Sequence, residues 1–433
     1  MYYDIIIIGS GISGLYAAYN IQKMSPSTSF IVLEKHKKNW IGGRTSNDTF
    51  CGTQVVTGAG IGRKTKDRRL VRLLDELDLP YTDFQFKPHY SPQIDAIVDT
   101  TSAIRWLKTE YNKHATRPRT TFKEFAKPIL GDKSYNDFLV SAGYTDFENE
   151  DAFDVIQSYG MDDNACCWKG LHIDWKQLIA TLCNKIGANR IKTSMNVVSI
   201  NGVSIKAVSI ISLKKNGDKD PKEHPSLFRV ETDKQIIFES NKVIVATTID
   251  TIHRIVPGAS NKSSIYNEIK SQTFLRLYGK FSKKSAEIMK RHITGYTIVP
   301  GHLQKIIPMD ANKGVYMIAY SDNGHAVFLK KYLENTPKNR DVFCVLIEKA
   351  LGIPDNRLEL LAIKDYYWTV GTHYYTPLTT KYENRAEFIY AAQHPTDGIL
   401  VVGEVVSDNQ GWTNGALSSV DAVLTKKWIT TVV

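Results

Sequence analysis

The stretch DIIIIGSGISG at residues 4–14 decides the fold. Its four consecutive isoleucines predict a strand buried on both faces of a parallel sheet, and the glycine turn after them leads into a helix with apolar residues three and four positions apart. A second buried strand at 30–33 ends at Glu34. This order is typical of a dinucleotide-binding domain, in which helix N–H groups face a pyrophosphate and the acidic side chain holds ribose hydroxyls. An acidic residue at 34 favours FAD or NAD over NADP.

Composition narrows the class of protein. The chain has 433 residues and carries a formal net charge of +10. It is 42% hydrophobic and 23% charged, and this composition excludes a largely disordered chain. At roughly 150 residues per domain, its length predicts two or three domains. No apolar run reaches the ~18–20 residues of a membrane span, and the N-terminus has no basic leader. We therefore expect a soluble cytoplasmic (intracellular) protein. The basic clusters are short and lack interleaved aromatic residues, so we do not expect nucleic acid as a partner.

A second glycine motif, GGRT at residues 42–45, follows Glu34 closely. Its glycines allow close backbone approach, and Arg44 can neutralise a diphosphate. Together with the first motif, it resembles the signature of the flavin-containing amine oxidases, the family of the monoamine and polyamine oxidases. That resemblance implies an α/β fold, in which a Rossmann-like FAD-binding domain carries an inserted α+β substrate domain of the amine oxidase type.

The resemblance continues along the chain. The segment at residues 55–62 resembles the family's passage beside the flavin ring, and Val197 falls where a strand backbone meets the adenine. At the C-terminus, a buried strand at 399–402 ends in Gly403-Glu404, and GWTNGA at 411–416 opens a last helix. The family uses this Gly-Glu pair for the ribityl-phosphate arm and aims the helix at the N1–C2 edge of the ring, where a helix N-terminus stabilises negative charge. The cofactor-binding residues implied in this way are Gly9, Gly11, Ile12, Ser13, Gly14, Glu34, Lys35, Gly43, Arg44, Thr45, Gly58, Ala59, Gly60, Ile61, Val197, Gly403, Glu404, Trp412, Thr413 and Ala416.

The domain limits follow from the order of these segments. We expect the FAD domain to be discontinuous, with residues 1–80, 185–260 and 390–433. The substrate-binding domain is then expected over residues 81–184 and 261–389.

Three residues are the expected catalytic positions. The family holds the substrate nitrogen between two aromatic rings, and Trp412 falls at one wall and Tyr374 at the other, with Tyr375 as the alternate. Packing in the core is the simpler interpretation of that tyrosine-rich stretch. Arg276 stands where the family usually has a lysine near flavin N5, with Lys280 as the alternate and a surface arginine as the simpler interpretation. An arginine there keeps its charge and suits a substrate that bears a carboxylate, or a non-amine.

The expected function is FAD-dependent oxidation of an amine, or of an amino acid, by hydride transfer from the C–N carbon to flavin N5, with dioxygen as acceptor and an imine and peroxide as products. Members with covalent flavin carry a cysteine where this chain has His373, so non-covalent FAD is expected, and no metal is expected. One alternative is a flavin-dependent oxidase or desaturase of a non-amine substrate, which Val56 and Arg276 favour. Another is a flavoprotein with a binding or structural role.

Overall fold

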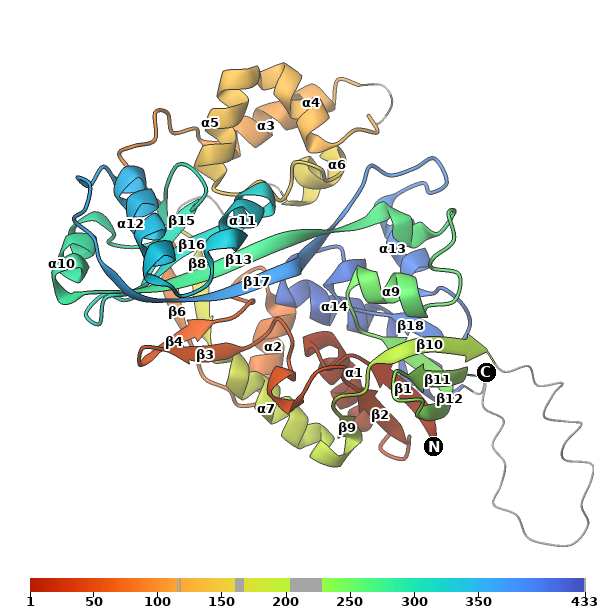
Figure 1. The fold of residues 1–433 in the computed structure, drawn as a ribbon. Helices are drawn as coiled ribbons and strands as arrows, with labels where there is room; N and C mark the ends of the chain where they lie inside the picture. The colour runs from red at the N-terminus through yellow and green to blue at the C-terminus, as the bar shows by residue number, and fades with distance from the viewer. Residues whose placement is uncertain (115, 117, 160–166, 203–227, 432–433) are drawn as a thin grey trace, which may run out of the picture.

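The computed structural model describes residues 1–114, 116, 118–159, 167–202 and 228–431. Two sheets organise these residues (Figure 1). The larger has seven strands in the order β10-β11-β12-β1-β2-β9, with β18 paired to β12, and the second has six in the order β17-β13-β16-β15-β14-β7. The strands of the larger sheet are β1 (Tyr2–Ile8), β2 (Phe30–Leu33), β9 (Ile191–Lys192), β10 (Val197–Gly202), β11 (Phe228–Thr232), β12 (Ile237–Val245) and β18 (Ile399–Val401). Those of the second are β7 (His89–Tyr90), β13 (Ile269–Phe281), β14 (Thr297–Ile298), β15 (Lys305–Asp310), β16 (Val315–Asp322) and β17 (Leu360–Tyr375).

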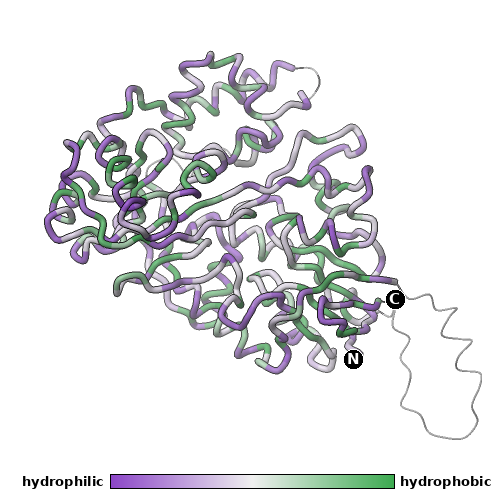
Figure 2. The backbone as a smooth tube through the Cα atoms, in the orientation of Figure 1, coloured by the Kyte–Doolittle hydropathy of each residue, from purple (hydrophilic) through white to green (hydrophobic). Residues whose placement is uncertain are grey.

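The strand β1 has the position that its isoleucines predict. It lies between β12 and β2 and is parallel to both. Ile5 and Ile7 belong to a core cluster on one face of the sheet, whereas Ile6 and Ile8 belong to another cluster on the opposite face. All four are at most 4% exposed, so both faces of the strand are covered. Figure 2 shows hydrophobic stretches running through the interior of the fold, with hydrophilic residues at many outer turns.

Helices cover the two sheets. On the glycine-loop side of the larger sheet, α1 packs against α7 and α14, and α2 packs against α14. Four helices, α3 to α6, build a separate apolar cluster above the second sheet (Figure 1). The longer helices are α1 (Ile12–Met24), α2 (Arg68–Glu76), α3 (Thr100–Tyr111), α4 (Phe122–Leu130), α5 (Asp132–Ala142), α7 (Trp175–Ile186), α10 (Lys283–His292), α12 (Pro337–Leu351), α13 (Arg385–Gln393) and α14 (Thr413–Val423). The short ones are α6 (Ala152–Asp154), α9 (Ile249–Ile255), α11 (Asn323–Leu329) and α15 (Lys426–Thr430).

Two small sheets complete the fold beside the two large ones. The hairpin of β3 (Asn47–Phe50) and β4 (Thr53–Val56) stands alone, and β5 (Gly62–Arg63), β8 (Lys169–Ile173) and β6 (Tyr81–Gln85) form a three-stranded sheet. Leu171 and Ile173 of β8 belong to the same core cluster as α1 and α7. Tyr81 of β6 packs against that cluster and the apolar residues of α7 belong to it, so both elements extend the nucleotide-domain core across the expected limits at 80/81 and 184/185. Within the described residues, no helix has the length and apolar character needed to cross a bilayer.

Candidate cofactor site

The glycine loop joins β1 to α1, and its glycines face different surroundings. A Cβ at Gly9 would stand 2.3 Å from the Ala246 carbonyl oxygen, and one at Gly14 would stand 2.0 Å from the Gly9 carbonyl oxygen. These two positions admit only glycine because backbone packs directly against them. A Cβ at Gly11 would meet no protein atom within 4 Å. The open position is therefore the one at which a ligand can approach the backbone.

The helix α1 begins without a cap. Gly11 is its N-cap residue and provides no side-chain hydrogen bond, so the first N–H groups of the helix, at Ile12, Ser13 and Gly14, have no side-chain cap. An uncapped helix N-terminus of this kind is suited to a phosphate.

Glu34 lies beside this loop, as the sequence predicts. Its carboxylate accepts hydrogen bonds from the Ser10 backbone N–H at 3.0 Å, from the Ser10 hydroxyl at 2.7 Å and from the His36 N–H at 2.9 Å. The neighbouring Lys35 is exposed. The chain leading to Val197 runs alongside, because the Met195 N–H donates to the Glu34 carbonyl, and Val197 itself is buried in β10.

The GGRT motif lies directly against the glycine loop. Gly11 and Gly42 form a bridge, Gly43 has a positive φ of 57°, and the Thr45 N–H donates to the Gly42 carbonyl. Arg44 extends to the C-terminal half of the chain: its Nη1 donates to the Gly371 carbonyl at 2.7 Å and to Glu404 Oε1 at 2.8 Å. Arg44 therefore fixes Glu404 in this structure. The sequence predicts that Arg44 neutralises a diphosphate, and that role does not include this contact.

Glu404 is the centre of a buried hydrogen-bond cluster. One carboxylate oxygen contacts Arg44 and the Nδ1 of His373, and the other accepts from the Gly411 N–H at 3.2 Å. The Ile249 N–H donates to His373 Nε2 at 3.2 Å, so Nδ1 carries the ring proton and donates to Glu404. Although burial acts to raise it, the pKa of Glu404 lies well below its usual value, because His373, Arg44 and Gly411 stabilise the charged form. Sequence reasoning identified Glu404 but missed His373 as its partner.

The segment at 57–61 passes between Arg44 and β13. Its backbone is held by Arg44, because the Ala59 N–H donates to the Arg44 carbonyl at 2.7 Å and a Cβ at Gly58 would stand 2.3 Å from that oxygen. Arg276 reaches it from the other side, with Nε donating to the Gly58 carbonyl at 2.8 Å. Its Nη2 lies 2.9 Å from where a Cβ of Gly60 would stand. The structure thus brings Arg276 and this segment together. The last residue of the segment, Ile61, leads into β5.

The alternate to Arg276 lies elsewhere. The Lys280 amino group donates to the Lys313 carbonyl, near the far end of β13. Arg276 is 7% exposed, so it is not a surface arginine.

Trp412 is the N-cap residue of α14 and its side chain does not cap the N–H groups that follow it, beginning at Thr413. The guanidinium of Arg63 covers one face of its indole, with Cζ 3.6 Å from the ring centroid. Arg63 is itself buried and paired with Asp67 at 2.7 Å. No sequence signal singled out Arg63, which belongs to a two-residue strand and faces a tryptophan almost 350 positions later. Ala416 lies one turn into α14 and is buried.

Tyr374 and Tyr375 have different surroundings. Tyr375 is 2% exposed, its hydroxyl donates to the Ser407 carbonyl at 2.9 Å, and its ring packs edge-on against Phe388. It therefore belongs to the core. Tyr374 is half-buried on the opposite face of β17, and burial together with the nearby Glu150 carboxylate raises its pKa.

Unpaired polar atoms gather near the Glu404 cluster. Thr372 Oγ1 and Gln410 Oε1 are buried and have no hydrogen-bond partner among the residues that the structure describes. Both residues flank Gly411, where a Cβ would stand 3.6 Å from the Thr372 methyl group. A ligand with hydroxyl or amide groups would satisfy them. These two polar atoms, the two uncapped helix N-termini and the open position at Gly11 together suit a bound dinucleotide that carries a polar ring system.

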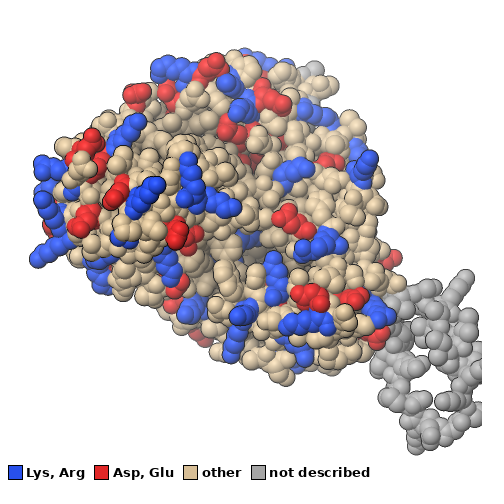
Figure 3. All heavy atoms as spheres, in the orientation of Figure 1, with Lys and Arg blue, Asp and Glu red and all other residues tan. Residues whose placement is uncertain are grey.

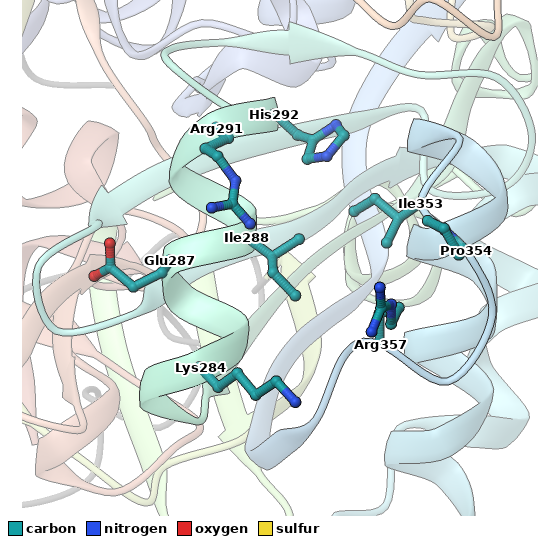
Figure 4. A pocket seen from close by; sticks show the side chains of 8 residues that line it. All are labelled: Lys284, Glu287, Ile288, Arg291, His292, Ile353, Pro354 and Arg357. Carbon is teal, nitrogen blue, oxygen red and sulfur yellow. The ribbon is translucent and has the colours of Figure 1, made fainter.

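A hollow of about 460 Å³ lies elsewhere, between α10 and the turn after α12 (Figure 4). Basic side chains of α10 crowd this end of the molecule (Figure 3). The residues that line the hollow are Lys284, Glu287, Ile288, Arg291, His292, Ile353, Pro354 and Arg357. None of them belongs to the predicted cofactor or catalytic residues.

Comparisons with known proteins show which proteins share the fold. The family model for an NAD(P)-binding Rossmann-like domain matches residues 7–77. An uncharacterized protein of Acanthamoeba polyphaga mimivirus is 22% identical over 98% of this chain and 93% of its own. Putrescine oxidase with putrescine bound superposes with a TM-score of 0.71 at 15% identity, over 98% of both chains. Cyclohexylamine oxidase from Brevibacterium oxydans does so with a TM-score of 0.71 at 15% identity, over 99% of this chain and 98% of that one.

These matches confirm the predicted fold class. The overlap with the two oxidases extends over both sheets and the helices on them, and the Rossmann-like match covers the glycine loop and the GGRT motif. The chain therefore has the amine oxidase fold, built on a Rossmann-like nucleotide-binding domain.

Proposed function

We propose that this chain binds FAD and oxidises an amine. The observation that carries the proposal is the convergence of the two ends of the chain: Arg44, whose motif bridges the glycine loop before α1, pairs with Glu404, 360 positions later, which accepts from Gly411 just before α14. In this arrangement α1 would bind the pyrophosphate and α14 the N1–C2 edge of the ring. Putrescine oxidase and cyclohexylamine oxidase share the fold, and the name of each enzyme states that it oxidises an amine.

Bound FAD would accept a hydride from the carbon beside the substrate nitrogen and pass the electrons to dioxygen, which leaves an imine and hydrogen peroxide. The chain's own residues would position the substrate. We assign Tyr374 and Trp412 as the rings beside the nitrogen, where they would exclude water, and Arg276 as the polar group near the reacting edge. We retain the discontinuous FAD domain as a proposal, with β6 and α7 packed onto it.

We expect the flavin to be non-covalent. The candidate for attachment, His373, is buried with both ring nitrogens engaged, one with Glu404 and one with the Ile249 N–H. Acid precipitation of the purified protein should therefore leave the yellow flavin in the supernatant, and the precipitated chain should have its unmodified mass of 48.8 kDa. A mass increase matching one FAD would contradict this prediction.

The proposal is tested by flavin content and substrate reduction. Purified protein should show flavin absorbance, and anaerobic mixing with a panel of amines, polyamines and amino acids should bleach it. Bleaching by none of these, with reduction by dithionite intact, would favour the flavin-dependent oxidase or desaturase of a non-amine, or the binding role. Protein that neither carries nor takes up flavin would contradict the proposal as a whole.

Replacing Tyr374 with alanine should lower kcat/KM for the best amine by about 2- to 30-fold while the flavin content stays unchanged, because one ring face contributes about 0.5–2 kcal/mol to the binding of a cation. Tyr390→Ala is the matched control, since Tyr390 is 65% exposed on α13. Stopped-flow measurements of flavin reduction at several amine concentrations compare both variants with the wild type. Equal loss in the two variants would remove Tyr374 from the substrate site.

The remaining partners are also proposals. Dioxygen is the expected acceptor, which a peroxide assay tests. An intracellular location would be tested by cell fractionation.

A further inference from the structure

Arg276 is a buried cation at the middle of β13. Its Nε donates to the Gly58 carbonyl at 2.8 Å, its Nη1 lies 3.7 Å from the Met317 sulfur, and its Cζ stands 4.1 Å from the centroid of the Tyr320 ring. A guanidinium has five N–H groups in a flat fork. A carbonyl, a thioether and a ring face are weak partners for a full charge.

No carboxylate among the described residues forms an ion pair with Arg276, although Arg44, Arg63 and Arg385 each have one. A buried charge without a counter-ion is costly, and structures normally pair it. The surrounding elements thus leave this position with an unmatched positive charge.

A second buried basic group lies close to Arg276, and carboxylates accompany this one. Lys305 of β15 is fully buried, and its Nζ lies 3.0 Å from the Tyr144 ring centroid and 4.5 Å from the Tyr320 ring centroid. Tyr320 therefore contacts both cations. The acidic groups Asp146 and Asp322 act on Lys305, and Asp322 is already engaged by the Thr145 N–H at 2.7 Å. Neither acid pairs with Arg276.

We infer that Arg276 binds an anionic group of the substrate, so that the amine oxidised by this chain also carries a carboxylate. The fork of a guanidinium matches the two oxygens of a carboxylate, which would supply the missing charge. A substrate with only an ammonium group would meet an uncompensated cation beside the Gly58–Gly60 segment and be repelled. The inference rests on the proposed function, because it specifies the substrate class of the same site.

Paired substrates test the inference in the FAD-loaded protein. Benzylamine is compared with phenylglycine, and phenethylamine with phenylalanine, so that each pair differs by one carboxylate. We expect the carboxylated member to reduce the flavin at least 10-fold faster at equal concentration. Faster reduction by the plain amines would overturn the inference and leave the proposed function standing.

Benzoate gives a readout that needs no turnover. It should perturb the flavin spectrum of the wild-type protein, and Arg276→Gln should weaken its affinity by about 10- to 150-fold, since a hydrogen bond to a charged group contributes about 1.5–3 kcal/mol. Arg276→Lys keeps the charge but not the forked geometry, so we expect a smaller loss of benzoate affinity. If the glutamine variant does not fold, the lysine variant provides the test. Arg72→Gln, at an exposed arginine of α2, is the control and should bind benzoate as the wild type does.

The outcomes separate the two claims. Unchanged benzoate affinity in both Arg276 variants would overturn the inference and assign the guanidinium to the flavin alone. If no amine or amino acid reduces the flavin but benzoate binding still depends on Arg276, the proposed oxidation fails while the anion site stands.

Discussion

Replacing Gly11 with alanine is expected to impair flavin binding while leaving the thermal stability of the flavin-free protein nearly unchanged. A Cβ at this position meets no protein atom within 4 Å, and the backbone φ of −65° is accessible to alanine. The methyl group would occupy the space through which a pyrophosphate approaches α1. An overpacked contact costs about 1–3 kcal/mol, which corresponds to a rise of about 5- to 150-fold in the Kd for FAD.

Two glycine variants provide the comparison. Gly14→Ala should unfold the loop itself, because its Cβ would stand 2.0 Å from the Gly9 carbonyl oxygen, so both Tm and flavin content should fall. Gly324→Ala, in α11, also places a methyl group in open space and should leave both quantities nearly unchanged. Tm comes from the unfolding of flavin-free protein, and Kd from quenching of FAD fluorescence. A Gly11→Ala protein that binds FAD as tightly as the wild type would remove the pyrophosphate from this loop.

The parts of the fold that the sequence predicts are those whose signal is local. Four isoleucines, a glycine turn, a helix and a strand ending in Glu34 follow one another within 34 residues, and each step restricts the next. The structure places Glu34 beside the glycine loop as expected. The same holds for the C-terminal strand, its Gly403-Glu404 end and the start of α14.

The contacts that complete the site have no local signal. His373 of β17 meets Glu404 because β17 packs against the short helical turn that follows β18. Arg63 covers Trp412 because β5 and α14 are brought together by the core around α2. Such pairings depend on tertiary packing between segments that are separate in the sequence, and periodicity within one segment contains no information about them. The expected limit at 184/185 likewise falls inside α7, whose apolar face packs on α1.

Replacing Glu404 with glutamine is expected to lower the free energy of unfolding by about 3–5 kcal/mol at pH 7, the usual cost of removing one partner of a buried ion pair. Arg44 would lose its carboxylate, and His373 would donate to a neutral amide. Urea unfolding of the flavin-free protein measures the change. Glu76→Gln is the matched control: Glu76 pairs with Lys23, but both side chains are more than 40% exposed, so about 0–1 kcal/mol is expected.

The pH dependence gives this prediction its sharper test, because a purely steric role for residue 404 would not produce it. The pKa of Glu404 is lower in the folded protein than in the unfolded chain, where it is about 4.3. Its contribution is therefore fully present above that unfolded value and is lost as the pH falls toward the folded pKa. The stability difference between wild type and Glu404→Gln should stay constant from pH 7 to about pH 5 and narrow below about pH 4. A difference that widens on acidification would mean that the carboxylate is not held by Arg44 and His373, and with it the link between the two ends of the chain would fail.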